Sequence, residues 1–144
     1  MLCSRWIADG GLKATIVLLV AFSTLGVAAD TTGTPPRASM ATLMTRDLES
    51  VPGKEVVMLT VTYPGGVASL PHRHDAQVFV YVLEGEVTMQ VRGSAAVTLR
   101  PGGTFYEAPQ DVHVVSENSN KTLPARILVV MIKDKGKAVL RLAE

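Results

Sequence analysis

The sequence has few of the residues on which several protein classes depend. A single cysteine, Cys3, stands among 144 residues, which excludes an internal disulfide framework and a cysteine-rich zinc module. Aromatic residues make up 5% of the chain, too few for a platform that stacks nucleic-acid bases. Neither sign of charge dominates, because 14 Lys and Arg residues are balanced by 13 Asp and Glu residues. We therefore expect no nucleic-acid partner and no acidic disordered tail.

The chain begins with the pattern of a secretory signal peptide. Arg5 and Lys13 precede an uncharged apolar run over residues 14–27, and the small residues Ala28 and Ala29 follow it. The run is shorter than the ~20 residues that a membrane-spanning helix needs. We expect cleavage after Ala29, export to the periplasm or the medium, and no stable membrane insertion after cleavage. An uncleaved N-terminal anchor and a buried core helix are the alternatives.

After the leader, short β-rich runs alternate with turns made of Gly, Pro and Asn. No long window carries a helical stripe, and many short strands separated by turn residues are typical of an antiparallel sandwich or barrel. The expected strands cover residues 55–63, 78–83, 87–91, 96–99, 104–107, 112–116 and 126–132.

A single barrel domain accounts for this pattern. The expected boundaries are a signal peptide over 1–29, an N-terminal lead-in over 30–49, the barrel over 50–133 and a C-terminal segment over 134–144. The lysines from Lys133 to Lys137 are expected to lie in a solvated terminal loop.

Three histidines, His72, His74 and His113, are the residues with the clearest chemistry. Side chains at i and i+2 of an extended chain point to the same face, so His72 and His74 are placed to share one metal ion. His113 belongs to a later strand, which an antiparallel barrel can bring beside the first. Neutral imidazole is a preferred ligand for divalent iron, zinc, copper and nickel. Three ordinary half-buried or surface histidines are the alternative interpretation.

Two motifs around these histidines resemble the paired motifs of the cupin superfamily. Gly66, followed by five residues and then His72-Arg73-His74, with Gly85 further along, resembles the first motif. The segment from Gly102 to His113 resembles the second. The two motifs are specific in combination, although each alone is weak.

The resemblance spans roughly residues 50–133 and implies both a fold and a site. Cupins are small β-barrels, so the implied fold class is all-β, a jelly-roll barrel preceded here by the signal peptide. They usually bind iron, manganese, nickel or zinc in the barrel mouth. By resemblance, His72, His74 and His113 match three of the family's four ligands. A homodimer is also implied, because cupins often pair through their sheets.

The sequence departs from the cupin pattern at two positions. The family's fourth ligand is a glutamate, whereas this chain has Val78 there, with Gln77 beside it. We expect a three-histidine site; Gln77 as a ligand through a local bulge, and a weaker or absent metal, are the alternatives. Asp111 stands where the family usually has glycine, and we expect a shortened turn that keeps His113 as a ligand.

Tyr106 and Glu107 are the candidate catalytic residues near the barrel mouth. Neighbouring residues of a strand face opposite ways, so at most one of the two points inward. An inward Glu107 would act as a general base or as a replacement carboxylate ligand, and an inward Tyr106 would orient a substrate oxygen. The plainer alternatives are a solvent-facing glutamate and an aromatic core residue.

These features together predict an exported, metal-dependent cupin that acts on a small organic molecule. Open positions beside three imidazoles suit Fe²⁺ and dioxygen, so a dioxygenase-like oxidoreductase is the first expectation, with Mn²⁺, Ni²⁺ or Zn²⁺ as alternative metals. A metal-dependent isomerase or lyase is the second. A non-catalytic cupin that binds or senses a small ligand, and a purely structural barrel, are the remaining alternatives.

Overall fold

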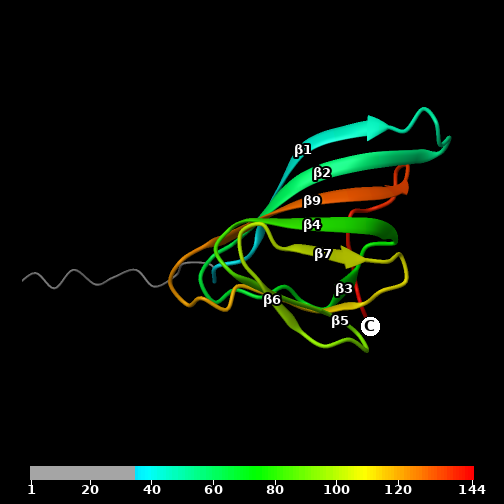
Figure 1. Ribbon diagram of the computed structural model, residues 1–144. Coiled ribbons are helices and arrows are strands. Elements are labelled where there is room, and N and C mark those ends of the chain that lie inside the picture. Colours follow the sequence, from blue (N-terminus) through cyan, green and yellow to red (C-terminus); the bar gives the residue numbers. More distant parts are fainter. Residues whose placement is uncertain (1–34) are drawn as a thin grey trace, which may run out of the picture. The chain divides into compact units, whose positions relative to one another are not determined.

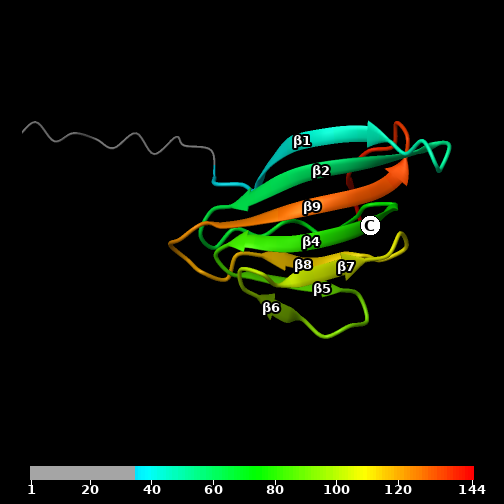
Figure 2. The same cartoon turned by 45° about the horizontal axis from the view of Figure 1, so that its top comes forward.

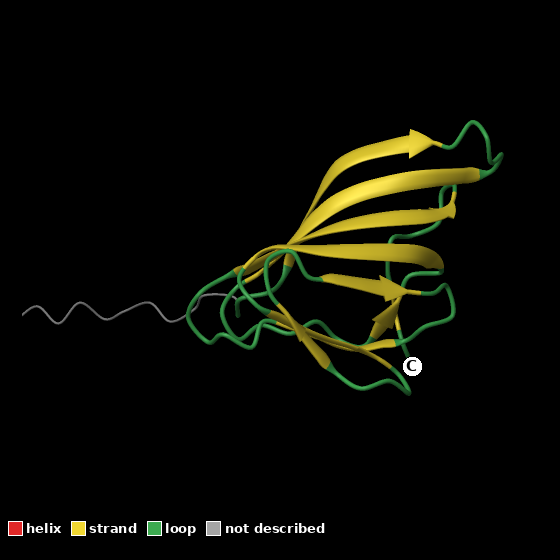
Figure 3. Ribbon diagram, viewed as in Figure 1, coloured by secondary structure: helices red, strands yellow, loops and turns green. Residues whose placement is uncertain are grey.

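The structure is a computed structural model that describes residues 35–144. This part of the chain consists of strands and loops without a helix (Figure 3), and so contains no helix able to span a membrane. The signal peptide expected over residues 1–29 lies outside the described residues. The strands are β1 (Ser39–Asp47), β2 (Lys54–Tyr63), β3 (His72–Arg73), β4 (Ala76–Glu84), β5 (Val87–Val91), β6 (Val97–Leu99), β7 (Thr104–Glu107), β8 (His113–Glu117), β9 (Ala125–Asp134) and β10 (Arg141–Leu142).

The strands form two five-stranded antiparallel sheets that face each other (Figures 1 and 2). The first, here the long-strand sheet, has the order β1-β2-β9-β4-β7. The second, the short-strand sheet, has the order β10-β3-β8-β5-β6. Strands distant in sequence lie side by side in both sheets, as β2 and β9 do, so the chain winds between the sheets. The all-β barrel expected from the sequence is confirmed.

The core is made by the inward face of the long-strand sheet. Buried and outward side chains alternate along β4, where Val78, Val80 and Val82 are buried, and the same alternation runs along β2 and β9. Period-2 alternation of β-branched residues is what a strand with one face on a core requires. Val87 and Met89 of β5 approach this face from the short-strand sheet and complete the core cluster.

The turn after β4 shows why the first motif ends in glycine. Gly85 has a φ of +75°, in the left-handed region that side chains disfavour. A Cβ atom at this position would also lie 2.7 Å from the Cα of Ala125. Glycine therefore allows β4 to end against the start of β9.

Two strands, β1 and β10, were not predicted from the sequence, and β3 was expected only as the extended segment that carries His72 and His74. β1 lies within residues 30–49, which sequence analysis assigned to a lead-in before the barrel, and β10 lies within the C-terminal segment. β1 gives no alternating signal because it is an edge strand and all its side chains are exposed. β3 and β10 are two residues long, so their pairing depends on tertiary contacts rather than on a local pattern.

The prediction that Lys133 to Lys137 form a solvated loop is wrong for its first residue. Lys133 continues the inward alternation of β9 and is 3% exposed. Its ammonium donates to Glu55 Oε1 at 2.5 Å and to the carbonyl of Lys137 at 2.5 Å. A buried charge needs such partners, and Lys133 has them at the end of the barrel.

Candidate metal centre

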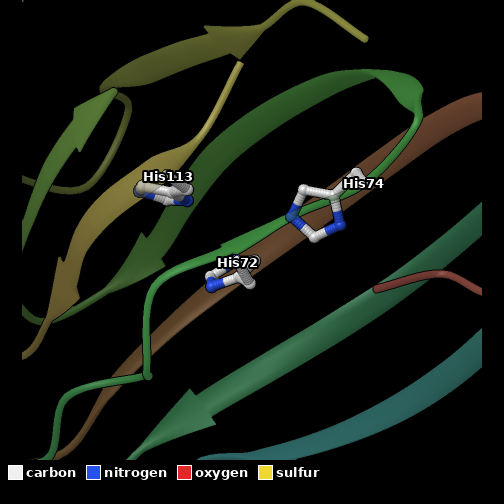
Figure 4. A group of neighbouring side chains, drawn as sticks. All are labelled: His72, His74 and His113. Atoms are coloured by element: carbon white, nitrogen blue, oxygen red, sulfur yellow. The ribbon is translucent and has the colours of Figure 1, made fainter. Parts of the chain in front are cut away.

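His72 and His113 are brought together by the register of the short-strand sheet. β3 and β8 are paired at one position, and that position joins His72 to His113. The centroids of the two rings lie 5.0 Å apart, and both side chains are buried. His74 follows β3, with its ring centroid 4.9 Å from that of His72. Figure 4 shows the three labelled rings around one small space between the segments that carry them.

Backbone carbonyls fix the orientation of two of the rings. His72 Nδ1 lies 2.7 Å from the carbonyl oxygen of Leu70, and His74 Nδ1 lies 2.5 Å from that of Val139. A carbonyl oxygen can only accept, so each Nδ1 carries the proton and donates it. The Nε2 atom of each ring is then left with a lone pair, the arrangement typical of metal-ligating histidines.

The His113 ring is buried without a hydrogen bond. Both of its ring nitrogens lack a hydrogen-bond partner, and its side chain is 3% exposed. Nδ1 lies 3.2 Å from Glu107 Oε1, a close contact of opposite charge when the ring is protonated, but without hydrogen-bond geometry. A buried polar atom without a partner is costly, by about 1–3 kcal/mol. A cation bound between the rings would satisfy it.

Glu107 points into the barrel, which overturns the plainer expectation that it faces solvent. It is 3% exposed, and its Oε2 lies 3.7 Å from His74 Nε2. On β7 it is the register partner of Val78 on β4. The carboxylate that the cupin pattern places at position 78 is therefore present on the neighbouring strand.

Among the described residues, the only basic groups within ion-pair distance of Glu107 are the imidazoles of His74 and His113, which carry a charge only when protonated. No lysine or arginine of this part of the chain forms an ion pair with Glu107. Buried carboxylates are paired or bind metals, so Glu107 requires either a protonated imidazole or a bound cation beside it.

Burial and neighbouring charge set the protonation of the site. Burial is the main reason why the pKa of His72 is lowered, and the nearby His74 and His113 rings lower it further. For Glu107, burial by itself would raise the pKa, but the His113 contact and the three imidazoles together outweigh it and lower the pKa. A neutral His72 and an ionised Glu107 are the forms that metal binding requires.

The donor set fits a divalent metal ion. One ligand atom from each of His72, His74 and His113 can be chosen so that all three lie within 4.8 Å of one another. Small ring rotations would bring these atoms to the spacing of roughly 3–4 Å that follows from metal–nitrogen bonds near 2.1 Å. The group of three histidines expected from the sequence is thus present.

Gln77 and Tyr106 lie on the opposite face from this site. Gln77 is exposed on β4, and Tyr106 is 48% exposed on β7. The Tyr106 hydroxyl donates to Gln77 Oε1 at 2.7 Å on the outer surface. The predictions that Gln77 ligates a metal and that Tyr106 orients substrate are wrong, because β4 has no bulge at Gln77 and the pleat turns both side chains outward.

The turn before β8 accommodates Asp111 in the position where cupins usually have glycine. The backbone N–H of Asp111 donates to the carbonyl of Ala108, and Asp111 Oδ2 accepts from the Ala108 N–H at 2.8 Å. Aspartate stabilises such a turn through its own side chain. His113 therefore keeps its place beside His72.

A cavity of about 120 Å³ opens beside the histidines, with walls that are mostly apolar. Its polar groups, besides the imidazoles and Glu107, include Tyr63 and Ser116, whose oxygens lie 2.7 Å apart. Sequence analysis did not single out these two residues. The alternation along β2 that buries Val57, Leu59 and Val61 also points Tyr63 inward and was the available signal. The rest of the wall is formed by core residues such as Val78, Val80, Met89, Ile127 and Met131.

A second recess, here the outer recess, has a volume of about 480 Å³ and adjoins this cavity. The linings of the two share Ala38, Ser69, His72 and Leu140. Apart from His72, Arg37 is the titratable residue in the lining of this recess. A molecule in the recess would therefore meet apolar surface, one guanidinium group and the edge of the histidine cluster.

Comparisons with known proteins agree with this fold. The family model described as "Cupin domain" matches residues 58–131. The DMSP lyase DddQ from Ruegeria pomeroyi has a similar fold, with a TM-score of 0.61 and 22% identity, over 74% of this chain and 52% of that one. An uncharacterised conserved protein with a double-stranded beta-helix domain from Klebsiella pneumoniae has a TM-score of 0.59 and 19% identity, over 78% of this chain and 89% of that one.

A recombinant oxalate oxidase in complex with glycolate is also similar, with a TM-score of 0.58 and 24% identity, over 76% of this chain and 56% of that one. The chain thus spans about half the length of the lyase and the oxidase. At these identities the likeness concerns the fold alone. No curated protein matches the chain.

Proposed function

The chain belongs to the cupin family, and we propose that it is a metal-dependent enzyme acting on a small organic molecule. The observation that carries the proposal is a buried carboxylate, Glu107, beside three imidazoles, one of which has no hydrogen-bond partner. His72, His74 and His113 would hold the ion. When bound, it would supply Lewis acidity and, as Fe²⁺, reactivity toward dioxygen.

Glu107 favours an enzyme over a binding module. Its lowered pKa keeps the carboxylate ionised near neutral pH, and an oxygen that does not bind the ion could accept a proton from a molecule in the cavity. The apolar walls exclude water from this carboxylate, and the Tyr63–Ser116 hydroxyl pair offers a hydrogen bond to a polar substituent.

We propose a dioxygenase-like oxidoreductase as the first reaction class, because histidine and carboxylate donors with open positions suit ferrous iron. Mn²⁺, Ni²⁺ and Zn²⁺ are the alternative metals. Lyase or isomerase chemistry is the second candidate, favoured by the placement of Glu107 as a base. Among structures of similar fold, one is a DMSP lyase and another an oxalate oxidase, so both classes are represented.

The lining of the two cavities supports a small anionic substrate. A divalent ion beside one carboxylate keeps a net positive charge, which attracts a carboxylate or an enolate. Arg37 adds a second positive charge at the outer recess, and the apolar walls suit a short hydrocarbon part. We therefore propose a small organic acid as the substrate class.

The metal is the first step to test. The protein is purified without oxygen, and its bound metal is measured by elemental analysis, beside the variant His72→Ala/His74→Ala. We expect stoichiometric metal in the natural protein and its loss in the variant. Natural protein without metal, even after incubation with Fe²⁺, Mn²⁺, Ni²⁺ or Zn²⁺, would overturn the proposal.

Reaction class is tested next with the loaded protein and a panel of short organic acids. Oxygen consumption that requires both metal and acid supports the oxidoreductase, and product formation without oxygen consumption supports the lyase or isomerase. Binding without turnover under either condition would return the chain to the class of ligand-binding cupins.

Export and pairing are also part of the proposal. The leader over residues 1–29 supports export to the periplasm or the medium, which the N-terminal sequence of the mature protein, recovered from cell fractions, will test. Phe79, Tyr81 and Tyr106 are exposed together on the outer face of the long-strand sheet, and such apolar patches often mark an interface. They support a homodimer, which sedimentation of the natural protein beside Phe79→Asp will test.

A further inference from the structure

The last residues of the chain form a strap across the segment that carries the first two histidines. This C-terminal strap, residues 137–143, is fastened at both ends by hydrogen bonds. At its start the carbonyl of Lys137 accepts from the buried ammonium of Lys133 at 2.5 Å. At its end the N–H of Ala143 donates to the carbonyl of Pro71 at 3.0 Å.

Between these ends the strap follows the histidine segment residue by residue. In β10, Leu142 is the register partner of His72, and Arg141 that of Arg73. The carbonyl of Val139 accepts the Nδ1 proton of His74 at 2.5 Å. The strap therefore supplies the contact that fixes the tautomer and the direction of the His74 ring.

A bidentate ion pair holds the strap against the residue that follows His74. Arg141 Nε lies 2.5 Å from Asp75 Oδ2, and its terminal nitrogen lies 2.8 Å from Oδ1. Asp75 is the one described residue other than glycine with a positive φ, of 48°. Asp75 thus bends the chain between His74 and β4, and Arg141 grips it at the bend.

The strap also shapes the space in front of the histidines. Leu140 lines both the cavity and the outer recess, and Leu142 lines the recess. Two leucines from the strap therefore stand where a ligand would pass toward the rings.

We propose that the C-terminal strap positions His74 for metal binding, with Arg141 as the positioning residue that holds the strap in place. The inference rests on the metal site proposed above. It predicts that residues distant in sequence from every histidine control metal affinity. Arg141 acts through the Val139 carbonyl, since it lies outside the group of ligands.

The test compares Arg141→Ala with Arg141→Lys and with a chain that ends at Lys137, all beside the natural protein. Lys135→Ala is the matched control, because Lys135 forms a similarly exposed ion pair with Asp47 on β1, away from the histidines. Two quantities are measured: the affinity for Co²⁺, together with its visible absorption spectrum, and the tautomer of His74 in metal-free protein by nitrogen NMR. The melting temperature of each metal-free variant reports whether it folds.

We expect Arg141→Ala to weaken Co²⁺ binding by about 3- to 10-fold, and loss of the strap to weaken it by about 10- to 100-fold. Arg141→Lys should regain part of the affinity, and Lys135→Ala should leave it unchanged. In the metal-free natural protein, His74 should show a single tautomer with its proton on Nδ1, and Arg141→Ala should mix the tautomers.

The outcomes separate this inference from the proposed function. Folded Arg141→Ala and strap-deleted proteins that keep the natural Co²⁺ affinity, spectrum and His74 tautomer would overturn the strap's role while the metal site stands. If the natural protein binds no Co²⁺ but shows a single His74 tautomer, and the strap-deleted protein shows mixed tautomers, the metal site is overturned while the positioning of His74 stands.

Discussion

The two sheets of the barrel differ in how long their strands are paired with one another. In the long-strand sheet, β2 is paired with β9 along its whole length, from Lys54 with Asp134 to Tyr63 with Ala125. In the short-strand sheet, β3 shares one register pair with β8 and two with β10. The first sheet is therefore held by its own ladder and core, whereas part of the second depends on contacts from loops and from the C-terminal strap.

Side chains supply much of the order that the short ladders lack. Asn118, which is 1% exposed, donates to the carbonyls of Tyr63 and Leu123, and thereby ties the loop after β8 to the end of β2. The three histidines all come from the short-strand sheet or its loops, whereas Glu107 reaches the site from β7 of the long-strand sheet. The comparison teaches that the long ladders and most of the candidate ligands are carried by different sheets, as is common where loops on a scaffold hold functional residues.

The largest effect is expected from the buried charge of the long-strand sheet. Lys133→Met removes the ammonium that pairs with Glu55 and leaves a partly buried carboxylate without its partner. Breaking a buried pair from one side costs about 3–5 kcal/mol of unfolding free energy, which urea denaturation will measure. The double variant Lys133→Met/Glu55→Met should recover most of the loss. A single variant as stable as the natural protein would contradict the burial of this charge.

A smaller effect is expected where the two sheets meet at the site. Val78→Glu places a second buried carboxylate opposite Glu107 across β4 and β7. In metal-free protein the added polar group should lower the unfolding free energy by about 1–3 kcal/mol. The exchange Val78→Glu/Glu107→Val returns a single carboxylate to the position typical of cupins and should restore stability. An exchange no better than the single substitution would show that the two positions do not share one space.

Strands with a clear local pattern were predictable from the sequence. The expected runs over 55–63, 78–83, 87–91, 104–107 and 126–132 lie within the observed β2, β4, β5, β7 and β9, because alternating β-branched residues and turn residues define them locally. Such a pattern is missing from β1, whose side chains are all exposed, and from β3 and β10, which are two residues long.

The pH dependence of stability should reveal the contributions of the buried His72 and Glu107. The pKa of His72 is lowered in the folded protein, so below the unfolded value of 6.5 the unfolded chain binds more protons and is favoured. The lowered pKa of Glu107 acts in the same direction below 4.5. We expect metal-free stability, measured with a chelator present, to fall as pH drops below about 6.5. His72→Asn should flatten the first part of the fall; an unchanged slope would exclude His72 as its source.

The sequence located the site's histidines and named Glu107 as a candidate carboxylate, but it could not decide whether Glu107 points inward. His72 and His74 share a face by strand periodicity, and His113 was found because the chain has no other histidine after them. The identity of the inward residue of the Tyr106–Glu107 pair depends on the register of β7 with β4, which no local pattern fixes. The carbonyl of Val139 was also out of reach, because it is a backbone group that only the tertiary fold brings to His74.

The smallest effect on stability is expected from a substitution at Tyr106, next to Glu107, whose substitution should weaken metal binding. Tyr106 and Glu107 are neighbours on β7, but the pleat places the tyrosine outside and the glutamate inside the barrel. Tyr106→Phe removes only an exposed hydrogen bond to Gln77, so stability should change by about 0.5 kcal/mol or less. Its metal affinity, measured by competition with a chelator, should equal that of the natural protein, whereas Glu107→Gln should lose roughly tenfold or more. Equal losses of metal affinity in the two variants would mean that any change in β7 disturbs the site. The division between a structural outer face and a chemical inner face would then be wrong.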